Sequence, residues 1–150
     1  AGNRDNPTMY PFALPKSIGD AQALADVIAS LEKLPMNPEP GRGPWGPGTP
    51  EFEKGKQLYA DNCVNCHGDT GLGDVEKLYP RINGQHYNYM VRQFEWIRDG
   101  KRRNANPDMV EQIKNFSDDE MKQVINYASW VEIPPEDRAP SKDWLNPDFE

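Results

Sequence analysis

The stretch DNCVNCHGDTGLGD, residues 61–74, holds both cysteines of the chain and one of its two histidines. Three chemistries use a pair of cysteines separated by two residues. A redox-active dithiol begins a helix beside a βαβ unit, and a structural zinc site takes four ligands, usually from two such pairs. A c-type haem uses Cys-x-x-Cys-His: two thioether bonds hold the porphyrin and the adjacent histidine lies under the iron. The surroundings of Cys63, Cys66 and His67 distinguish these three chemistries.

The apolar pattern predicts helices on both sides of the motif and almost no strand. Apolar residues recur at helical spacing in four segments, which are residues 18–31, 49–63, 86–100 and 117–131. Thr49 and Pro50 are a typical cap and first residue for the second helix, and Gly100 ends the third. Ser117 and Glu120 form the pattern of a capping box at the start of the fourth.

The remaining segments are rich in helix-breaking residues. Residues 35–50 contain so many Pro and Gly residues that we expect an extended linker, in which Trp45 packs onto another part of the molecule. The last segment, residues 134–150, is expected to be an irregular tail anchored by Trp144 and Phe149. This divides the chain into an N-terminal helical segment (1–34), the linker (35–50), one helical domain (51–133) and the tail (134–150).

These surroundings favour haem attachment over the other chemistries. No βαβ pattern accompanies the motif, as a redox dithiol would require. A zinc site would lack a convincing fourth ligand, because His86 is the other histidine and His67 directly abuts Cys66. A disulfide between the two cysteines remains the plain alternative. Haem attachment accounts for Cys63, Cys66 and His67 together.

A low-spin haem iron takes a second axial ligand, and methionine is the ligand that raises the reduction potential. Met90 and Met121 fall inside predicted helices, where we expect them to pack in the core. Met109 lies between two predicted helices, in a segment expected to be a loop that reaches over the haem face. Met109 is therefore our predicted ligand. His86 is the rival, although a surface or helix-capping role suits it better.

Residues 51–132 resemble a class I cytochrome c domain. The resemblance rests on Gly55 and Tyr59 in the first helix, the CVNCHG motif, the GLG loop, the YPRI segment, and Tyr127 and Trp130 in the last helix. The segment YPRINGQHYNYMVRQFEWIRDGKR is particularly similar to one domain of the dihaem class I cytochromes of bacterial periplasms. The resemblance implies an all-α fold of three to four helices around one covalent haem c, with the first and last helices crossing near Gly55. An N-terminal helix and the linker are additions to it.

The resemblance also assigns roles to individual residues. Cys63 and Cys66 become the thioether residues, with His67 as the proximal iron ligand and Met109 as the distal one. Pro80 would offer its carbonyl oxygen to the far ring nitrogen of His67. Arg81 would lie near a haem propionate.

The N-terminal segment shows a faint internal repeat. At an offset of 100 residues, NPTM (6–9) matches NPDM (106–109), and Ser17 matches Ser117. One interpretation makes residues 1–34 the remnant of a degenerate cytochrome domain, with Met9 as a former ligand. The other, which we favour, is that Met9 simply packs against its neighbours.

Electron transfer is the function that these features predict. A haem with two protein ligands has no open position for substrate, and no acid–base pair or nucleophile constellation is visible, so we do not expect an enzyme. Two alternatives stay open: a haem subunit docked permanently to an oxidoreductase, and a ligand-binding or catalytic haem if Met109 does not bind the iron. The family resemblance implies a periplasmic location, with a signal peptide already removed.

The net charge of the chain limits the classes of partner that it can bind. The net charge is −7, from 24 acidic and 17 basic side chains, which argues against nucleic acid. No run of 18 apolar residues is present that could span a membrane. We expect a redox donor and an acceptor, at least one of which has a basic docking patch.

Overall fold

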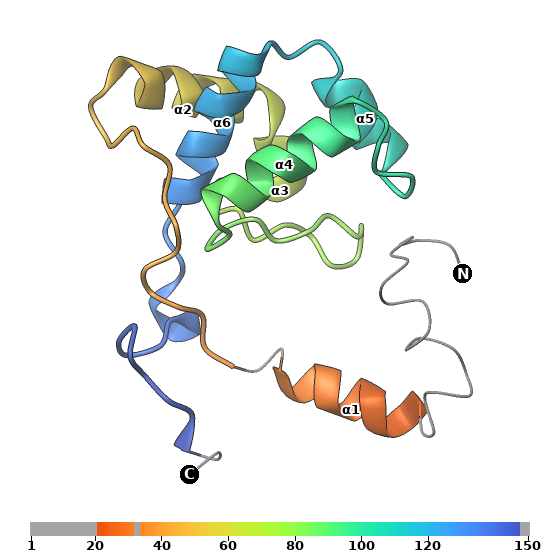
Figure 1. The fold of residues 1–150 in the computed structure, drawn as a ribbon, viewed down its shortest axis with the longest axis vertical. Coiled ribbons are helices and arrows are strands. Elements are labelled where there is room, and N and C mark those ends of the chain that lie inside the picture. The colour runs from red at the N-terminus through yellow and green to blue at the C-terminus, as the bar shows by residue number, and fades with distance from the viewer. Residues whose placement is uncertain (1–20, 32–33, 148–150) are drawn as a thin grey trace.

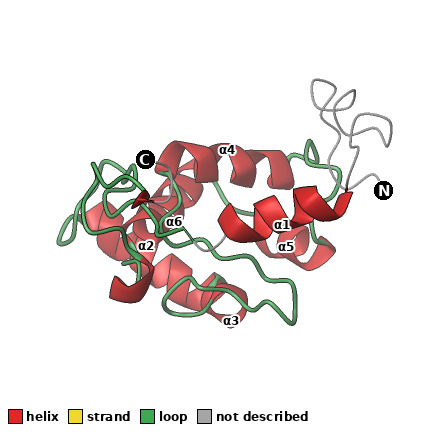
Figure 2. Cartoon of the chain, turned by 90° about the horizontal axis from the view of Figure 1, so that it is seen from below, coloured by secondary structure: helices red, strands yellow, loops and turns green. Residues whose placement is uncertain are grey.

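The computed structural model describes residues 21–31 and 34–147, and in this part of the chain it is helical. Its elements are α1 (Ala21–Leu31), α2 (Pro50–Asn62), α3 (Val64–His67), α4 (Tyr87–Arg98), α5 (Pro107–Ile113), α6 (Asp118–Trp130) and the 3₁₀ turn η1 (Pro135–Asp137). Helices α2 to α6 gather into one body (Figures 1 and 2). Within the described ranges the backbone pairs as strands do at only two isolated bridges, Met36 with Arg138 and Asp74 with Tyr79. The all-α prediction is confirmed.

The helix starts follow the capping residues that the sequence provides. Thr49 caps α2, and its hydroxyl oxygen accepts a hydrogen bond from the Phe52 backbone N–H at 3.3 Å. Ser117 and Glu120 form the expected reciprocal capping box at α6. Both predicted helix starts are confirmed.

Helices α2 and α6 cross at Gly55. A Cβ atom placed on Gly55 would lie 2.1 Å from the Gln123 carbonyl oxygen and 3.3 Å from Cβ of Tyr127. Only a residue without a side chain lets the two backbones approach this closely. Phe52 and Tyr59 flank the crossing on α2 and place their rings at 5.4 and 5.2 Å from the Tyr127 ring. The expected crossing of the first and last helices is therefore present.

Helix α4 completes the core. It packs against α6 and α5, and its apolar face supplies the buried residues Met90, Phe94 and Ile97. Ile113, at the end of α5, and Met121, at the start of α6, are 2% and 0% exposed. The predicted core role of Met90 and Met121 is confirmed.

The Pro/Gly-rich linker packs against α6 through linker residues 43–45. Buried Asn126 pairs with Trp45 through both backbone groups: Oδ1 accepts from the Trp45 N–H at 2.9 Å, and Nδ2 donates to the Trp45 carbonyl at 2.7 Å. Ser129 Oγ accepts from the Gly43 N–H at 2.8 Å. The Arg42 guanidinium covers the Trp130 ring at 4.6 Å from its centroid. Composition predicted the extended backbone, while these tertiary contacts fix its path.

The C-terminal tail is also less irregular than expected. The Met36 N–H donates to the Asp137 carbonyl at 2.6 Å, and the Ala139 N–H donates to the Met36 carbonyl at 2.8 Å. Trp144 is half-buried, and Phe149 lies outside the described residues. The start of the tail is thus paired with the start of the linker, as the lower part of Figure 1 shows.

Helix α1 lies apart from the helical body in Figure 1. It coincides with most of the predicted helix 18–31, and its Leu24 and Val27 side chains are 43% and 55% exposed. Met9, Ser17 and the proposed repeat lie outside the described residues. No described helix has the length and apolar character needed to cross a membrane.

Replacing Gly55 by Ala should destabilise the protein by roughly 1 kcal/mol. The added methyl would meet the Gln123 backbone, which cannot rotate away, and overpacking of this kind costs about 1–3 kcal/mol, offset by the ~1 kcal/mol that Ala gains in a helix. Denaturant unfolding of the haem-loaded protein measures the loss. Gly46→Ala is the control, because its Cβ would meet Trp130 at an ordinary 3.7 Å. Equal stability of the two variants would contradict the tight crossing.

Candidate functional site

The two cysteines and the histidine lie on one turn of backbone directly after α2. Cys63 ends α2 and begins α3, and its carbonyl accepts from the His67 N–H at 2.9 Å and from the Cys66 N–H at 3.2 Å. Residues three apart on a helical turn are neighbours, so the thiols of Cys63 and Cys66 share a face. Gly68, at φ 73°, ends the turn by adopting a left-handed conformation that L side chains rarely adopt.

Both cysteines carry free thiols and are half-buried. Burial raises the pKa of Cys63 to about 12, with a further contribution from the neighbouring Cys66. The Cys63 thiol is therefore neutral at pH 7. Redox-active cysteine pairs depend instead on a lowered thiol pKa, so the environment of Cys63 argues against the dithiol alternative. The structure does not contain the disulfide alternative either.

His67 is buried, with 8% of its surface exposed. Its Nδ1 lies 2.9 Å from the carbonyl oxygen of Pro80. Because a carbonyl oxygen only accepts hydrogen bonds, this contact places the ring proton on Nδ1 and leaves the lone pair of Nε2 available. That is the tautomer that binds a metal through Nε2.

Two glycines allow the Pro80 carbonyl to reach His67. A Cβ on Gly73 would lie 2.3 Å from the Tyr79 carbonyl oxygen and 2.7 Å from that of Pro80, and a Cβ on Gly71 would lie 3.1 Å from the Asn83 nitrogen. The Gly73 N–H donates to the His67 carbonyl at 2.9 Å, which draws this loop back to the histidine. The GLG sequence therefore brings the 79–83 segment against the turn that carries His67.

Met109 lies in a helix, which corrects the prediction that it belongs to a loop. It is the third residue of α5, whose start is capped by Asn106 and has Pro107 at its first position. Asn followed by Pro is a recognised helix start, so the signal was present in the sequence. The Met109 side chain is half-buried and packs against the core cluster that contains Phe94 and Ile97.

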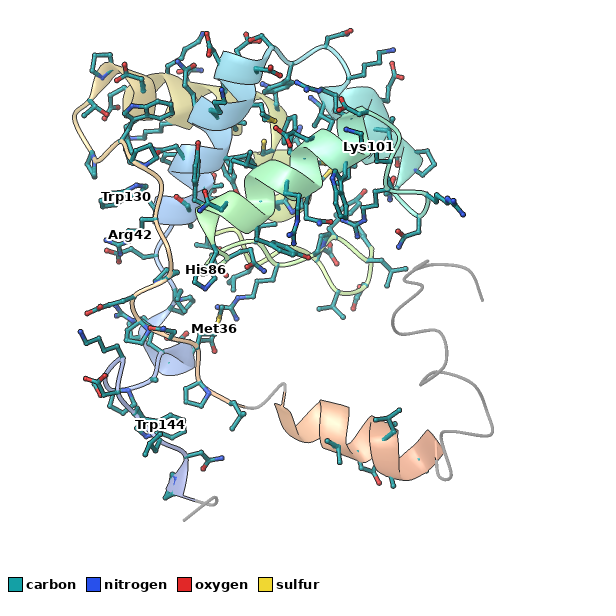
Figure 3. All side chains as sticks on the ribbon, in the orientation of Figure 1. Met36, Arg42, His86, Lys101, Trp130 and Trp144 are labelled. Carbon is teal, nitrogen blue, oxygen red and sulfur yellow. The ribbon has the colours of Figure 1, made fainter. Side chains whose placement is uncertain are left out.

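His86 has a different partner from His67. It occupies the N-cap position of α4, it is exposed, and its Nδ1 accepts a hydrogen bond from the Gly41 N–H of the linker at 3.2 Å. Figure 3 shows it on the side of the molecule where the linker passes. The surface position suggested by the sequence is present, but the His86 side chain bonds to the linker and does not cap α4.

Arg81 pairs within the protein. Its guanidinium forms an ion pair with Asp137 of the tail at 2.7 Å, and its Nε donates to the Asn83 side chain. The sequence analysis singled out neither Asp137 nor Asn83, although Asn83 is only 2% exposed. No local pattern marks Asp137, because its pairing with Arg81 joins residues 56 positions apart. The contact of Asn83 with the Glu132 carbonyl likewise spans 49 positions.

The donor set fits a covalently attached haem. Two adjacent thiols are available for thioether bonds, and a buried histidine presents an unprotonated Nε2 beside them. The alternative zinc site needs four ligands, and among the residues with described positions no three His, Cys, Asp or Glu side chains gather closely enough to hold a metal ion. When bound, the haem supplies an iron that exchanges one electron between its ferrous and ferric states.

Comparisons with known proteins agree with this site. The Cytochrome c family model matches residues 52–132. A protein of Stutzerimonas stutzeri named thiosulfate dehydrogenase electron acceptor is 31% identical over 87% of this chain and 62% of its own length. Cytochrome c4 of Thiocapsa roseopersicina is 30% identical over 83% of this chain and 65% of its own length. This chain thus spans about three fifths of these two relatives.

Solved structures place the fold in the same group. The structure of cytochrome c4 from Acidithiobacillus ferrooxidans matches with a TM-score of 0.58 and 25% identity, over 85% of this chain and 75% of that one. Cytochrome c4 is a dihaem class I cytochrome, so the resemblance of this chain to one such domain is confirmed. The chain therefore belongs to the cytochrome c family and binds haem c covalently.

Proposed function

We propose that the protein carries one electron at a time on a single haem c that is bound axially by His67 and Met109. The observation that carries this proposal is the 2.9 Å contact between Nδ1 of His67 and the Pro80 carbonyl, since it prepares Nε2 as the proximal ligand. Cys63 and Cys66 hold the porphyrin edge. Met109, on α5 and partly buried against the core, is the distal ligand.

The surrounding residues suit electron transfer because they hold the ligands still. Tyr59 donates its hydroxyl proton to the Gly68 carbonyl at 2.8 Å, which ties the end of the haem-attachment turn to α2. Pro80 keeps the ring proton of His67 on Nδ1 in both oxidation states. A site whose ligands do not move between the two states has little reorganisation to undergo during transfer.

We assign the haem to the domain formed by residues 51–133, with residues 1–34 as a separate N-terminal segment. The proposed setting is the periplasm, where such homologues are typically found. The proposed donor is a dehydrogenase of the kind named for the Stutzerimonas stutzeri relative. A net charge of −7, to which two haem propionates add, favours a partner that presents a basic patch.

The first test is haem content. We expect one haem to stay on the polypeptide through denaturing acid–acetone extraction, because Cys63 and Cys66 form its two thioether bonds. Mass spectrometry should give the chain plus one haem. A mass equal to the bare polypeptide would contradict attachment. Replacing His67 should remove the normal low-spin spectrum while the haem stays attached.

The second test concerns the distal ligand. Met109→Ala should open the iron to added ligands and lower the reduction potential, because the axial ligand is a main determinant within the ~0.8 V range of protein-bound haems. The band that reports thioether bonding to ferric iron should disappear. Met90→Leu, a volume-conserving change in the core, is the matched control and should keep the band. A band that survives Met109→Ala would assign another methionine, and a bis-histidine spectrum in the native protein would assign His86.

The third test concerns docking. Reduction by a thiosulfate dehydrogenase in stopped flow should slow as salt rises, because charges separated by more than about 10 Å are screened at 0.1 M ionic strength. A salt-independent rate would contradict the basic patch and indicate apolar docking, for which the exposed side chains of Leu72, Val75 and Leu78 are available. A rate that rises with salt would mean that the partner is acidic.

A further inference from the structure

A part of the chain outside the cytochrome c match contacts the segment that supports His67. We call residues 79–84 the proximal segment, since they include Pro80. We call Met36 together with residues 133–139 the clamp. The family match covers residues 52–132, so it begins after Met36 and ends before residue 133. Both segments of the clamp therefore lie outside the part of the chain that the family model matches.

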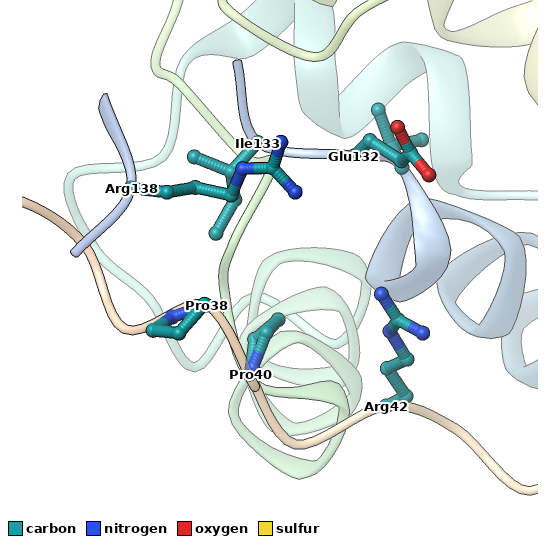
Figure 4. A pocket seen from close by; sticks show the side chains of 7 residues that line it. Pro38, Pro40, Arg42, Glu132, Ile133 and Arg138 are labelled. Atoms are coloured by element: carbon teal, nitrogen blue, oxygen red, sulfur yellow. The ribbon is translucent and has the colours of Figure 1, made fainter. Parts of the chain in front are cut away.

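The clamp is a short pairing of linker and tail. Its two backbone hydrogen bonds join Met36 to Asp137 and Ala139, at 2.6 and 2.8 Å. A third, from the Asp137 N–H to the Pro134 carbonyl at 3.0 Å, closes the turn that presents the Asp137 side chain. Figure 3 labels Met36 where the linker and tail run together, and Figure 4 shows Pro38 and Pro40 of the linker facing Ile133 and Arg138.

Three contacts join the clamp and the end of α6 to the proximal segment. Asp137 binds the Arg81 guanidinium at 2.7 Å. Nδ2 of buried Asn83, which also receives Nε of Arg81 on its Oδ1, is 3.4 Å from the Glu132 carbonyl. Gly84 packs so tightly that a Cβ there would lie 2.5 Å from Cε of Met36 and 2.9 Å from Cδ1 of Ile133.

The proximal segment is therefore held on two sides. On one side the GLG loop contacts it through Gly71 and Gly73. On the other side the clamp holds Arg81, the residue that directly follows Pro80. Both sets of contacts therefore oppose movement of the Pro80 carbonyl away from His67.

We propose that Asp137 is a positioning residue for the iron's proximal ligand: through Arg81 it fixes the Pro80 carbonyl against Nδ1 of His67. The inference rests on the proposed role of His67 as an iron ligand. Asp137 acts through Arg81 and Pro80 and has no contact with His67 itself. Because a strong hydrogen bond at Nδ1 raises the basicity of the imidazole and stabilises ferric iron, the clamp keeps the reduction potential lower than the domain alone would set it.

The test is Asp137→Asn in the full haem-loaded chain. The Arg81–Asp137 pair is partly exposed, at 32% and 37% of the two side chains, so its loss should speed opening of the Pro80 contact by about five-fold, the equivalent of about 1 kcal/mol. Hydrogen exchange of the His67 Nδ1 proton, followed by NMR in the ferrous protein, measures that opening. The reduction potential should rise at the same time.

Glu136→Gln is the matched control. It makes the same change of charge one residue away, on an exposed side chain of the same turn, and it should leave the exchange rate unchanged. Any rise in potential that Glu136→Gln produces measures the effect of charge alone. Equal exchange rates in Asp137→Asn and Glu136→Gln would overturn the proposal.

Arg81→Gln separates restraint from charge. Removing a positive charge by itself lowers the reduction potential, whereas removing the negative charge of Asp137 by itself raises it, so charge alone moves the two variants apart. Loss of restraint speeds exchange at His67 in both. The double variant should exchange no faster than the faster single variant, because both changes break one link. Additive effects on exchange would overturn the proposal.

Failure of the proposed function would be recognised separately. If His67 does not bind the iron, the ferrous wild-type protein will lack the imidazole resonance that the ring current of the haem shifts in a ligated histidine, and this absence contradicts the proposed function before any variant is compared. If that resonance is present but the exchange rate of the His67 Nδ1 proton is the same in wild type and Asp137→Asn, only the positioning role is wrong. Denaturant unfolding of each variant confirms that the holoprotein remains folded.

Discussion

The close approach of α2 and α6 at Gly55 is the constraint on which the rest of the molecule depends. The α2 backbone continues directly into the turn that carries Cys63 and His67, so the angle at which α2 crosses α6 determines where the haem-attachment turn lies. Helix α6 in turn supports α4 on one side and the linker on another.

Local signals were sufficient to predict much of this arrangement. Capping residues such as Thr49 and Ser117 mark helix starts because they bond to backbone groups only a few residues away. The haem-attachment motif is also local, since its cysteines and histidine lie within five adjacent positions. Met109 was wrongly predicted to lie in a loop because a seven-residue helix is too short to show a clear apolar period. Asn106 and Pro107 are nevertheless a typical helix start. Helix starts could thus be predicted wherever both the capping residue and a long enough apolar pattern were present in the sequence.

The linker and the tail could not be predicted in the same way. Their path depends on single contacts between distant positions, such as Trp45 with Asn126 and Met36 with Asp137. Trp45 takes part through its backbone groups, and Met36 and Asp137 both do, so no side-chain pattern marks these contacts. The family resemblance predicts that Arg81 lies near a haem propionate, but it does not predict the ion pair of Arg81 with Asp137. Chemistry at the haem was therefore easier to infer than the supports behind it.

The Asn126 side chain imitates a neighbouring β-strand. Its amide offers one acceptor and one donor to the Trp45 backbone, as a peptide group would in a sheet. Such recognition is indifferent to side chains, and Pro44, between two residues whose N–H groups are bonded, loses nothing by having no N–H of its own. Gly41 and Gly43 are exceptions, since a Cβ there would collide with Nδ1 of His86 and with Oδ1 of Asn126 respectively. The linker is thus free to drift in sequence over evolution while its course over α6 stays the same.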